Sequence, residues 1–486
     1  MRLYRFFFLS MLLAAAISGK PQTRTTVNSV FSGAADPVFD TSSFRPDDKS
    51  PIIIADIYIT GNRKTKPYII EREIPFRIGN HMMRGDLPAR IELARQQLMN
   101  TALFIEVEVK VDRQVDDLVF ITVQVKERWY FFPLPYFKIV GRNFNEWWVE
   151  HNRSLKRVNY GLKLIHNNIS GRADKLNLYL VNGYTQQASF RYAQPAADKS
   201  LKFGFDIGFS YSRNKEISFN TDSNKQIYIK NEEKFLSEIF RTDFALIYRP
   251  KVRTKHFLRM GFTSMKVDTA VTNRNPDYFP GHATKISFPE IGYTITHQNV
   301  DFIPYPGKGV TFTGTLMKRG FTSKMNMWQL NAAATYTIPV FPKSQIYLQA
   351  AGTLKLPFRQ PFYNRRLFGY GELYMRGLEY YVIDGVAGFI GRATLRREVL
   401  SFNIRPPVVI QGHDKIPFRF FLKVYGDAGY AYDKYPVNYS SLTNKLLHTY
   451  GVGLDIISFY DFVIRFEYTF NQLNEEDLFL HSRSDF

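Results

Sequence analysis

The sequence LKFGFDIGFSYS, residues 201–212, alternates strictly between apolar or aromatic residues and small or polar ones. A β-strand turns successive side chains to opposite faces, so this pattern predicts a strand with one apolar and one polar face. Segments of the same kind, about ten residues long as in membrane barrels, recur from residue 129 to the C-terminus, for example at residues 310–316, 328–338, 389–395, 418–424 and 450–456. Counting them predicts about sixteen strands, the first near 129–137 and the last at 476–486.

These strands are predicted to cross a membrane. Aromatic residues make up 16% of the chain, while the mean hydropathy is only −0.25, as expected when alternate residues of a strand meet lipid. A closed barrel satisfies every backbone polar group in a bilayer, as a helix does. We therefore predict an all-β transmembrane barrel of antiparallel strands over residues 129–486. A soluble barrel would carry its apolar face inside, and the alternation itself does not separate inside from outside.

The N-terminus carries an export signal. Arg2 and Arg5 precede an almost wholly apolar run at residues 6–17, and Ser18-Gly19 offers small residues for cleavage. The apolar run is shorter than the roughly 20 residues that a membrane-spanning helix needs. We predict a signal peptide at residues 1–19 and a flexible tether, rich in Ser, Thr, Asp and Pro, at residues 20–50. The chain has 0 Cys, which excludes a lipid-anchored N-terminus and any disulfide.

Residues 51–128 differ from the tether in having regular spacings of apolar residues, which predict a small α+β domain. Alternating apolar residues predict strands at 53–59, 105–111 and 119–125, and apolar spacings of three and four predict a helix over 86–98, after a first helix near 65–70. The order strand, helix, helix, strand, strand resembles the polypeptide-transport-associated (POTRA) domain, whose landmarks match Gly61-Asn62 and the segment 98–104. A generic small α+β domain is the alternative.

The resemblance implies a periplasmic domain that binds extended clients. A three-stranded sheet covered by helices on one face leaves edge strands, and an edge strand can accept another chain by β-augmentation. We take Ile105, Val107 and Val109 as the client-binding candidates.

One long segment, residues 357–385, interrupts the strand rhythm. Its aromatic residues Phe368, Tyr370, Tyr374, Tyr380 and Tyr381 favour packing over disorder, and in its middle stands Met375-Arg376-Gly377-Leu378-Glu379. Here the chain resembles the BamA/TamA-like outer-membrane assembly superfamily, also called the bacterial surface antigen family, in which an Arg-Gly loop tip folds back into the barrel. This chain departs from the family pattern in two ways. The family usually has Val and an aromatic residue where Met375 and Leu378 stand here, and its main assembly factors carry several periplasmic repeats where this sequence shows one.

The resemblance also supplies acceptors for the loop arginine. Glu398 and Asp427, the latter within Tyr425-Gly426-Asp427-Ala428-Gly429, match the acidic positions and the barrel motif with Gly426 and Gly429. Strand parity independently places both carboxylates on the polar face. We predict that Arg376 docks between them. The alternative is a solvated Arg376, with Arg392 and Arg396 neutralising the acids.

Two further features concern the ends of the predicted barrel. Pro133 and Pro135 cannot donate ladder hydrogen bonds, so the seam between the first and last strands is expected to be weak, unless the prolines mark only the linker. Phe486 resembles the terminal aromatic by which assembly machinery recognises barrel clients.

The sequence predicts a protein of the outer membrane that inserts or translocates polypeptides and is not an enzyme. No His pair has zinc-protease spacing and no Ser lies in a nucleophile elbow, so we expect no catalytic residue, metal or cofactor. The net charge of +20 favours anionic lipid or glycolipid, acidic partners or a basic pore, and no motif indicates nucleic acid. Extended clients and accessory lipoproteins are the expected partners. The rival functions are a passive or structural pore and a secretion pore dedicated to one partner.

Overall fold

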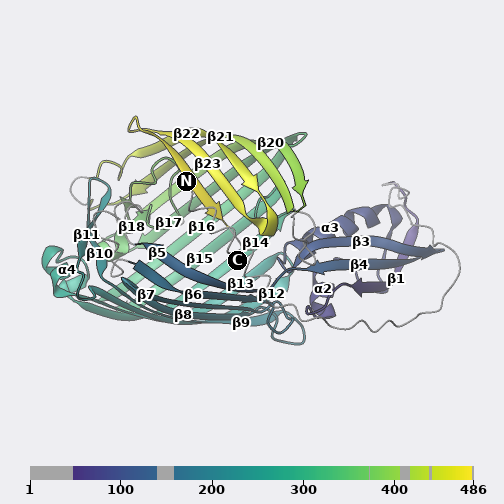
Figure 1. The fold of residues 1–486 in the computed structure, drawn as a ribbon, viewed down its shortest axis with the longest axis horizontal. Helices are drawn as coiled ribbons and strands as arrows, with labels where there is room; N and C mark the ends of the chain where they lie inside the picture. Colours follow the sequence, from purple (N-terminus) through teal and green to yellow (C-terminus); the bar gives the residue numbers. More distant parts are fainter. Residues whose placement is uncertain (1–46, 140–157, 372, 406–415, 437–439, 484–486) are drawn as a thin grey trace. The chain divides into compact units, whose positions relative to one another are not determined.

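The computed structural model describes residues 47–139, 158–371, 373–405, 416–436 and 440–483 (Figure 1). The predicted signal peptide, most of the tether and Phe486 lie outside these residues. In the described part of the chain no helix is both long enough and apolar enough to cross a membrane.

The N-terminal domain is a four-stranded sheet with two helices. Its strands are β1 (Pro51–Thr60), β2 (His81–Met83), β3 (Phe104–Val115) and β4 (Leu118–Glu127), in the order β2-β1-β4-β3, and its helical elements are α2 (Pro67–Glu73), η3 (Arg84–Asp86) and α3 (Leu87–Met99). The sequence predicted three of these strands. It missed β2, because three residues are too few for an alternation to be visible.

The core of this domain lies between the helices and the sheet. Ile70 of α2 and Leu87 and Leu98 of α3 are fully buried, as are Val119 and Ile121 of β4. β1 and β4 pair in parallel, which places the helical segment between them in the chain as a crossover over one face of the sheet. β3 therefore forms a long edge of the sheet, with β4 as its only partner among the described strands.

A sixteen-stranded sheet follows the N-terminal domain, which confirms the predicted number of strands. All neighbouring strands pair antiparallel, and the order follows the chain from one end of the sheet to the other. Its members are β5 (Phe131–Ile139), β6 (Val158–Asn167), β7 (Lys175–Gly183), β8 (Thr185–Gln194), β9 (Phe203–Asn214), β12 (Ser237–Lys251), β13 (Thr254–Val267), β14 (Lys285–Val300), β15 (Gly309–Thr322), β16 (Met325–Phe341), β17 (Ser344–Leu356), β20 (Ala387–Ile404), β21 (Ile416–Tyr432), β22 (Leu446–Ile457), β23 (Val463–Asn471) and β24 (Glu476–Arg483).

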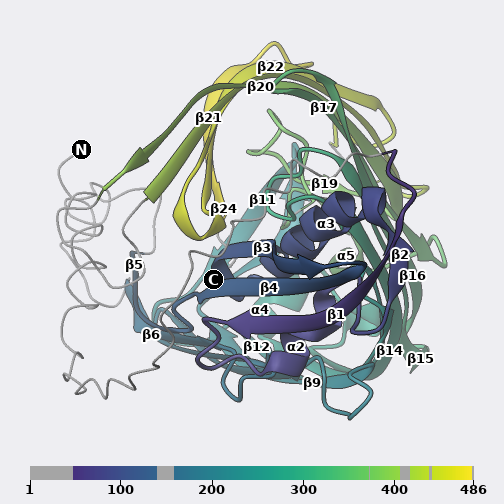
Figure 2. The ribbon, with the colours of Figure 1, turned by 90° about the vertical axis from the view of Figure 1, so that its right-hand side faces the viewer.

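The sheet curls round on itself into a barrel, as Figure 2 shows. β5 and β24 are its two end strands, and no ladder joins them among the residues that the structure describes. β5 pairs with β6 alone and β24 with β23 alone. Within the described residues, the barrel therefore has two strand edges without a ladder partner.

The two faces of the curled sheet have opposite chemistry. Large apolar side chains point outward, for example Leu246 (49% exposed), Leu330 (46%) and Leu422 (54%). The alternate positions carry buried charges, among them Lys423 (5% exposed) and Asp427 (4%). The structure thus places the apolar face outside, which the alternation in the sequence did not decide.

Short elements lie between the strands at the end of the barrel away from the N-terminal domain. They are the hairpin β10 (Glu216–Asp222) and β11 (Lys225–Lys230), the helix α4 (Thr269–Arg274) and the turn η6 (Pro280–His282). Tyr278, Phe279 and Phe362 are buried in an apolar cluster with residues of the hairpin and of the strands β13, β14 and β16. This cluster fixes the first part of the long segment 357–385, which contains Phe362.

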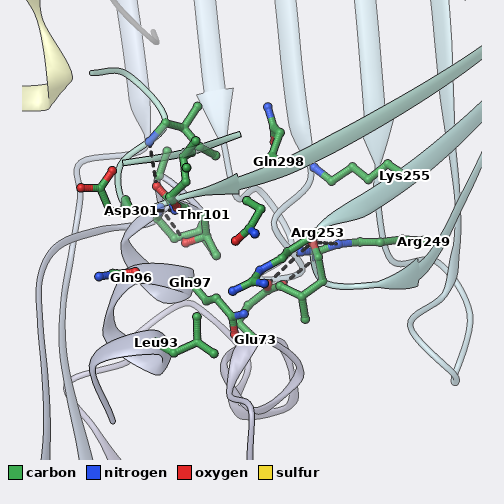
Figure 3. A pocket seen from close by; sticks show the side chains of 18 of the residues that line it. Glu73, Leu93, Gln96, Gln97, Thr101, Arg249, Arg253, Lys255, Gln298 and Asp301 are labelled. Carbon is green, nitrogen blue, oxygen red and sulfur yellow. Dashed lines mark hydrogen bonds and ion pairs between the residues drawn. The ribbon is translucent and has the colours of Figure 1, made fainter. Parts of the chain in front are cut away.

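A buried ion pair joins the N-terminal domain to the sheet. Both carboxylate oxygens of Glu73, at the end of α2, accept hydrogen bonds from Arg249 of β12, at 2.6 and 2.8 Å. Arg72 adds a third contact at 2.9 Å. Burial would raise the pKa of Glu73, but the two guanidinium groups hold it below its usual range. The pair lines a cavity of about 1150 Å³ between the domain and the strands (Figure 3).

We predict that Glu73→Gln loosens the domain from the sheet. The variant leaves Arg249 buried without its counter-charge, a loss of about 3–5 kcal/mol for a buried pair. The distribution of spin-label distances between the domain and β12 should become broader than in the wild type at pH 7. Because the folded-state pKa of Glu73 is lowered, the stabilisation is intact at neutral pH and is lost as the pH falls below the ordinary carboxyl range of about 4.3 and through the folded-state value.

Glu108→Gln is the matched control, because Glu108 pairs with Lys110 on β3, away from this cavity, and both side chains are more than two-fifths exposed. Such a pair contributes about 0–1 kcal/mol. Equal distance distributions in the two variants would contradict the proposed role of Glu73.

Candidate functional site

The segment between β17 and β20 packs into the barrel as an ordered loop. It contains the helix α5 (Phe362–Arg365) and the strands β18 (Arg366–Phe368) and β19 (Ile383–Asp384), which pair with each other. We call residues 357–386 the inner loop. β18 and β19 form its neck, and residues 369–382 beyond the neck carry the Arg-Gly tip.

Apolar contacts hold the tip in place. Met375 and Leu378, on either side of Arg376-Gly377, are 1% and 2% exposed and belong to one cluster with Ile390 of β20 and Leu447 of β22. These are the two positions at which the sequence departs from the family pattern. Both side chains are apolar and both are buried.

Arg376 points from the tip to the inner wall of the barrel. Its Nε donates to Asp427 Oδ2 at 2.9 Å, and its Nη2 donates to the other oxygen, Oδ1, of the same carboxylate. The guanidinium also lies 3.9 Å from the centre of the Tyr425 ring. The side chains of Arg376 and Asp427 are 8% and 0% exposed. This bidentate geometry is one that an ammonium group cannot reproduce.

The second acid near Arg376 is Glu467 of β23, which the sequence analysis did not name. Its Oε1 lies 3.7 Å from Arg376 Nη1 and 2.6 Å from Lys423 Nζ. Lys423 in turn lies 2.5 Å from Asp455 Oδ1. Charges of alternating sign therefore run from the loop tip across β21, β22 and β23. Each buried charge has a partner, which is the condition for placing charges out of water.

The prediction that Glu398 receives Arg376 is wrong. Glu398 accepts from Arg419 Nε at 2.9 Å. It stands on the inner face, as parity indicated, but the ladder places Arg392, six residues earlier on β20, opposite Asp427. At 3.3–3.4 Å per residue the two acids are about 20 Å apart along the strands. Parity gives the face of a strand and not the height along it, so one guanidinium cannot reach both carboxylates.

Arg392 and Arg396, the cations of the alternative interpretation, have different surroundings. Arg392 Nε lies 3.7 Å from Asp427 Oδ2, so Asp427 has a second positive neighbour. Its Nη2 donates to the carbonyl of Tyr374 in the inner loop. Arg396 donates to the Pro306 carbonyl and lies 3.9 Å from the Tyr305 ring centre. Arg376 and Arg392 therefore both lie close to the Asp427 carboxylate, whereas Arg396 contacts Tyr305 and Pro306.

The glycines at the site differ in what they make possible. Gly377 has φ +79°, and a Cβ there would lie 2.4 Å from Thr469 Cγ2, so both backbone and space require glycine. A Cβ at Gly429 would lie 2.9 Å from the Phe389 carbonyl oxygen and 3.6 Å from Met375 Sδ, so this glycine allows the tip to pack closely. A Cβ at Gly426 would meet only an ordinary contact at 3.8 Å.

The remaining predicted site residues lie away from the tip. Val107 and Val109 of β3 are 6% and 7% exposed and face the core of the N-terminal domain, so their side chains are not available to a client. Ile105, which stands at a register shift of the β3–β4 ladder, is half-buried. Pro133 and Pro135 lie on the end strand β5.

Sequence reasoning missed Glu467, Lys423 and Asp455, although a signal for each was present. Each stands at a polar position of an alternating strand, for example Glu467 between Phe466 and Tyr468. Their mutual contacts depend on the register of β21, β22 and β23, which alternation does not give.

The fold and this site define a POTRA-type domain followed by a sixteen-stranded antiparallel sheet with an inner loop. Residues 52–128 match the family model described as "POTRA: Surface antigen variable number repeat". A comparison with curated proteins gave no match.

Three solved structures are similar in fold. BamA from Haemophilus ducreyi lacking POTRA domains 1–3 is 16% identical, with 89% of this chain and 84% of that chain covered and a TM-score of 0.48. CdiB from Escherichia coli is 11% identical, with 99% and 96% covered and a TM-score of 0.46. CdiB from Acinetobacter baumannii is 12% identical, with 89% and 73% covered and a TM-score of 0.44.

We predict that Arg376→Ala releases the inner loop while the barrel stays folded. Removing one partner of a buried pair costs up to about 3–5 kcal/mol. Hydrogen exchange and trypsin cleavage within residues 357–386 should increase, Arg376→Lys should protect the loop only in part, and the Arg376→Ala/Asp427→Asn double variant should be milder than Arg376→Ala.

Arg359→Ala is the control, since Arg359 belongs to the same loop and is exposed. If loop protection in Arg376→Ala equals that in Arg359→Ala, the ion pair does not hold the loop.

A second prediction concerns Gly377. Gly377→Ala should displace the tip, because the added methyl group overlaps Thr469 and the backbone has positive φ. Gly371→Ala should be silent, since a Cβ there meets nothing within 4 Å. Hydrogen exchange of the loop measures both variants, and a silent Gly377→Ala would show that the tip does not need this close approach.

Proposed function

We propose that this protein lies in the outer membrane with its N-terminal domain in the periplasm. The proposal rests on the outward-facing leucines and aromatics of the sheet, which suit contact with lipid, and on the buried charges of its inner face. The predicted export signal at residues 1–19 and the POTRA match at 52–128 support the same location. The net charge of +20 suits anionic lipid and glycolipid as the surrounding surface.

We further propose that the protein inserts polypeptides into this membrane or moves them across it, without enzymatic chemistry. The observation that carries this proposal is that β5 and β24, the end strands of the barrel, share no ladder among the described residues. Unpaired backbone groups are costly in lipid, and a strand of a client would satisfy them. The free edges thus provide a template for a new strand.

The two free edges are not equivalent. Tyr130 O accepts from Asn167 N, so the even-numbered residues of β5 direct their backbone groups to β6 and the odd-numbered ones to the free edge. Pro133 and Pro135 are odd-numbered, so this edge lacks two donors. On β24, Glu475 O accepts from Asn471 N, and the even-numbered residues, including Leu478 and Leu480, face the free edge with their N–H groups. We therefore propose β24 as the better template.

Side chains, and not a ladder, bridge the seam at the end next to the N-terminal domain. Arg128 lies 2.6 Å from Asp461 of the turn η7 (Phe459–Asp461), and Tyr460 OH accepts from Trp129 N at 2.9 Å. Such contacts can separate without unzipping a sheet. They suit a seam that opens to admit a client.

The edge strand β3 is the proposed first contact for a client. Glu106, Glu108 and Lys110 point outward while Val107 and Val109 are buried, so a client would pair with the main chain of β3 and meet these charged side chains. Accessory lipoproteins remain proposed partners. The rival functions are a passive pore plugged by the inner loop and a secretion pore dedicated to one partner.

We predict that vesicles containing the protein accelerate the membrane insertion of an unfolded barrel protein diluted from urea, relative to vesicles without it. A photo-crosslinker at Leu480, on the β24 edge, should trap the client, and so should one at Glu108 on β3. Leu246 of β12 and Gln124 of β4 are the matched controls, because both are exposed on strands already paired on both sides.

Ion conductance without accelerated insertion, and equal crosslinking at edge and control positions, would support the passive pore instead. A client trapped only at Glu108 would favour translocation through the barrel over templating at β24.

A further inference from the structure

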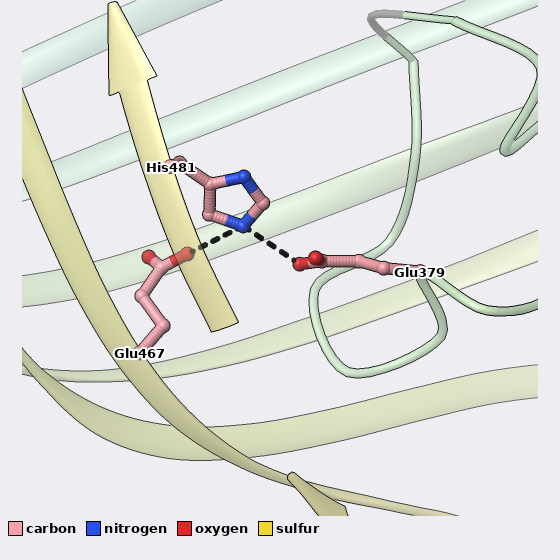
Figure 4. Close-up of side chains that lie close together, drawn as sticks. All are labelled: Glu379, Glu467 and His481. Atoms are coloured by element: carbon pink, nitrogen blue, oxygen red, sulfur yellow. Dashed lines mark hydrogen bonds and ion pairs between the residues drawn. The ribbon is translucent and has the colours of Figure 1, made fainter. Parts of the chain in front are cut away.

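Three potential metal ligands meet where the inner loop touches the end of the barrel sheet. They are Glu379 of the inner loop, Glu467 of β23 and His481 of β24. His481 Nε2 lies 3.0 Å from Glu379 Oε1 and 3.5 Å from Glu467 Oε2, and all three ligand atoms lie within 4.8 Å of one another. Figure 4 shows both carboxylates directed at the same ring nitrogen, with Nδ1 turned away from them.

Glu467 is already paired with Lys423 at 2.6 Å and lies 3.7 Å from Arg376. Nε2 of an imidazole carries at most one proton, which can be donated to only one of the two carboxylates. The side chain of Glu379 is 14% exposed, and His481 is its only ion-pair partner in the described part of the chain. A metal ion at this point would contact both carboxylates at once, whereas a proton on Nε2 can serve only one of them.

The spacing suits a tetrahedral ion. Nitrogen and oxygen ligands lie about 2.0–2.1 Å from zinc, which places the ligand atoms of a tetrahedron about 3.3 Å from one another. The observed 3.0 and 3.5 Å bracket this value. One imidazole and two carboxylates leave a fourth position for water, and an imidazole ligand favours a transition ion over calcium or magnesium.

The surroundings orient the ligands for such an ion. The two carboxylate oxygens of Glu467 have different partners: Oε1 contacts Lys423 at 2.6 Å, and Oε2 faces His481. An ion bound through Oε2 would therefore leave the pair with Lys423 intact. The Tyr374 ring stacks on the His481 ring, with centroids 5.4 Å apart and an interplanar angle of 27°. These outer contacts fix ligand orientation in the way that second-shell residues of metal sites do.

We propose that Glu379, Glu467 and His481 form a binding site for a divalent transition ion of the zinc class. The ion clasps the inner loop to the last two strands of the barrel. β24 has no other strand partner among the described residues, so the ion adds a connection to a strand that is otherwise held along one side only. The three positions lie 88 and 14 residues apart in the chain, so they form no recognisable sequence motif.

The test is a Zn²⁺ titration of the full-length, chelator-washed protein in detergent. We expect one tight site in the wild type, and X-ray absorption of the zinc complex should show nitrogen and oxygen ligands at about 2.0–2.1 Å. His481→Ala and Glu379→Gln should each weaken binding by about 100-fold or more, because even outer-shell partners are worth about 10- to 100-fold. His448→Ala, an exposed histidine on β22, should bind zinc like the wild type.

Zinc should also slow hydrogen exchange in residues 373–382 and in β24 of the wild type, and not in Glu379→Gln. Glu379→Gln lies in the loop and leaves all barrel strands unchanged, so it tests the site even if His481→Ala fails to fold. Wild-type binding no tighter than that of Glu379→Gln would overturn the proposal and leave a proton as the cation between the carboxylates. Because this measurement needs no client, its result is independent of the insertion assay.

Discussion

The ion pair of Arg376 and Asp427 is the contact on which the interior of this barrel depends. The strands direct apolar residues outward, so polar and charged residues must occupy the inner positions. Where the inner loop removes water from those positions, each charge requires a partner. Arg376 supplies one for Asp427 and contributes to a second at Glu467, and Lys423 continues the alternation to Asp455. The position of the inner loop and the charged residues of three strands therefore depend on each other, because each supplies the counter-charge that the other requires.

Much of the fold could be predicted from the sequence because strand alternation is a local signal. Residues 201–212 show a strand directly, and summing such segments gave the sixteen strands that the structure has. β2, with three residues, gave no such signal. Which face of the sheet is apolar could not be read from period alone, since inside and outside exchange without changing the pattern.

The site could be predicted only in part, for a related reason. Arg376 and Asp427 were found from a resemblance and from parity, and the structure places them in contact. Glu398 was misplaced because its height along β20 depends on the register with β21, a non-local quantity. Glu467 and His481 meet the loop only because the chain has closed most of the barrel by β23 and β24. Contacts of this kind do not exist in any window of the sequence.

The pairing of β18 with β19 has a consequence for how the inner loop changes over evolution. Arg366 faces Asp384 and Phe368 faces Ile383, so the chain returns to its starting point before it rejoins the wall of the barrel. Residues 369–382 therefore form a closed excursion, and insertions or deletions within it leave the register of β17 and β20 untouched. The pairing of β18 with β19 offsets the entropy cost of closing this part of the loop, and that cost grows only slowly with the number of residues enclosed. Natural variation can thus alter what fills the barrel without having to rebuild the barrel itself.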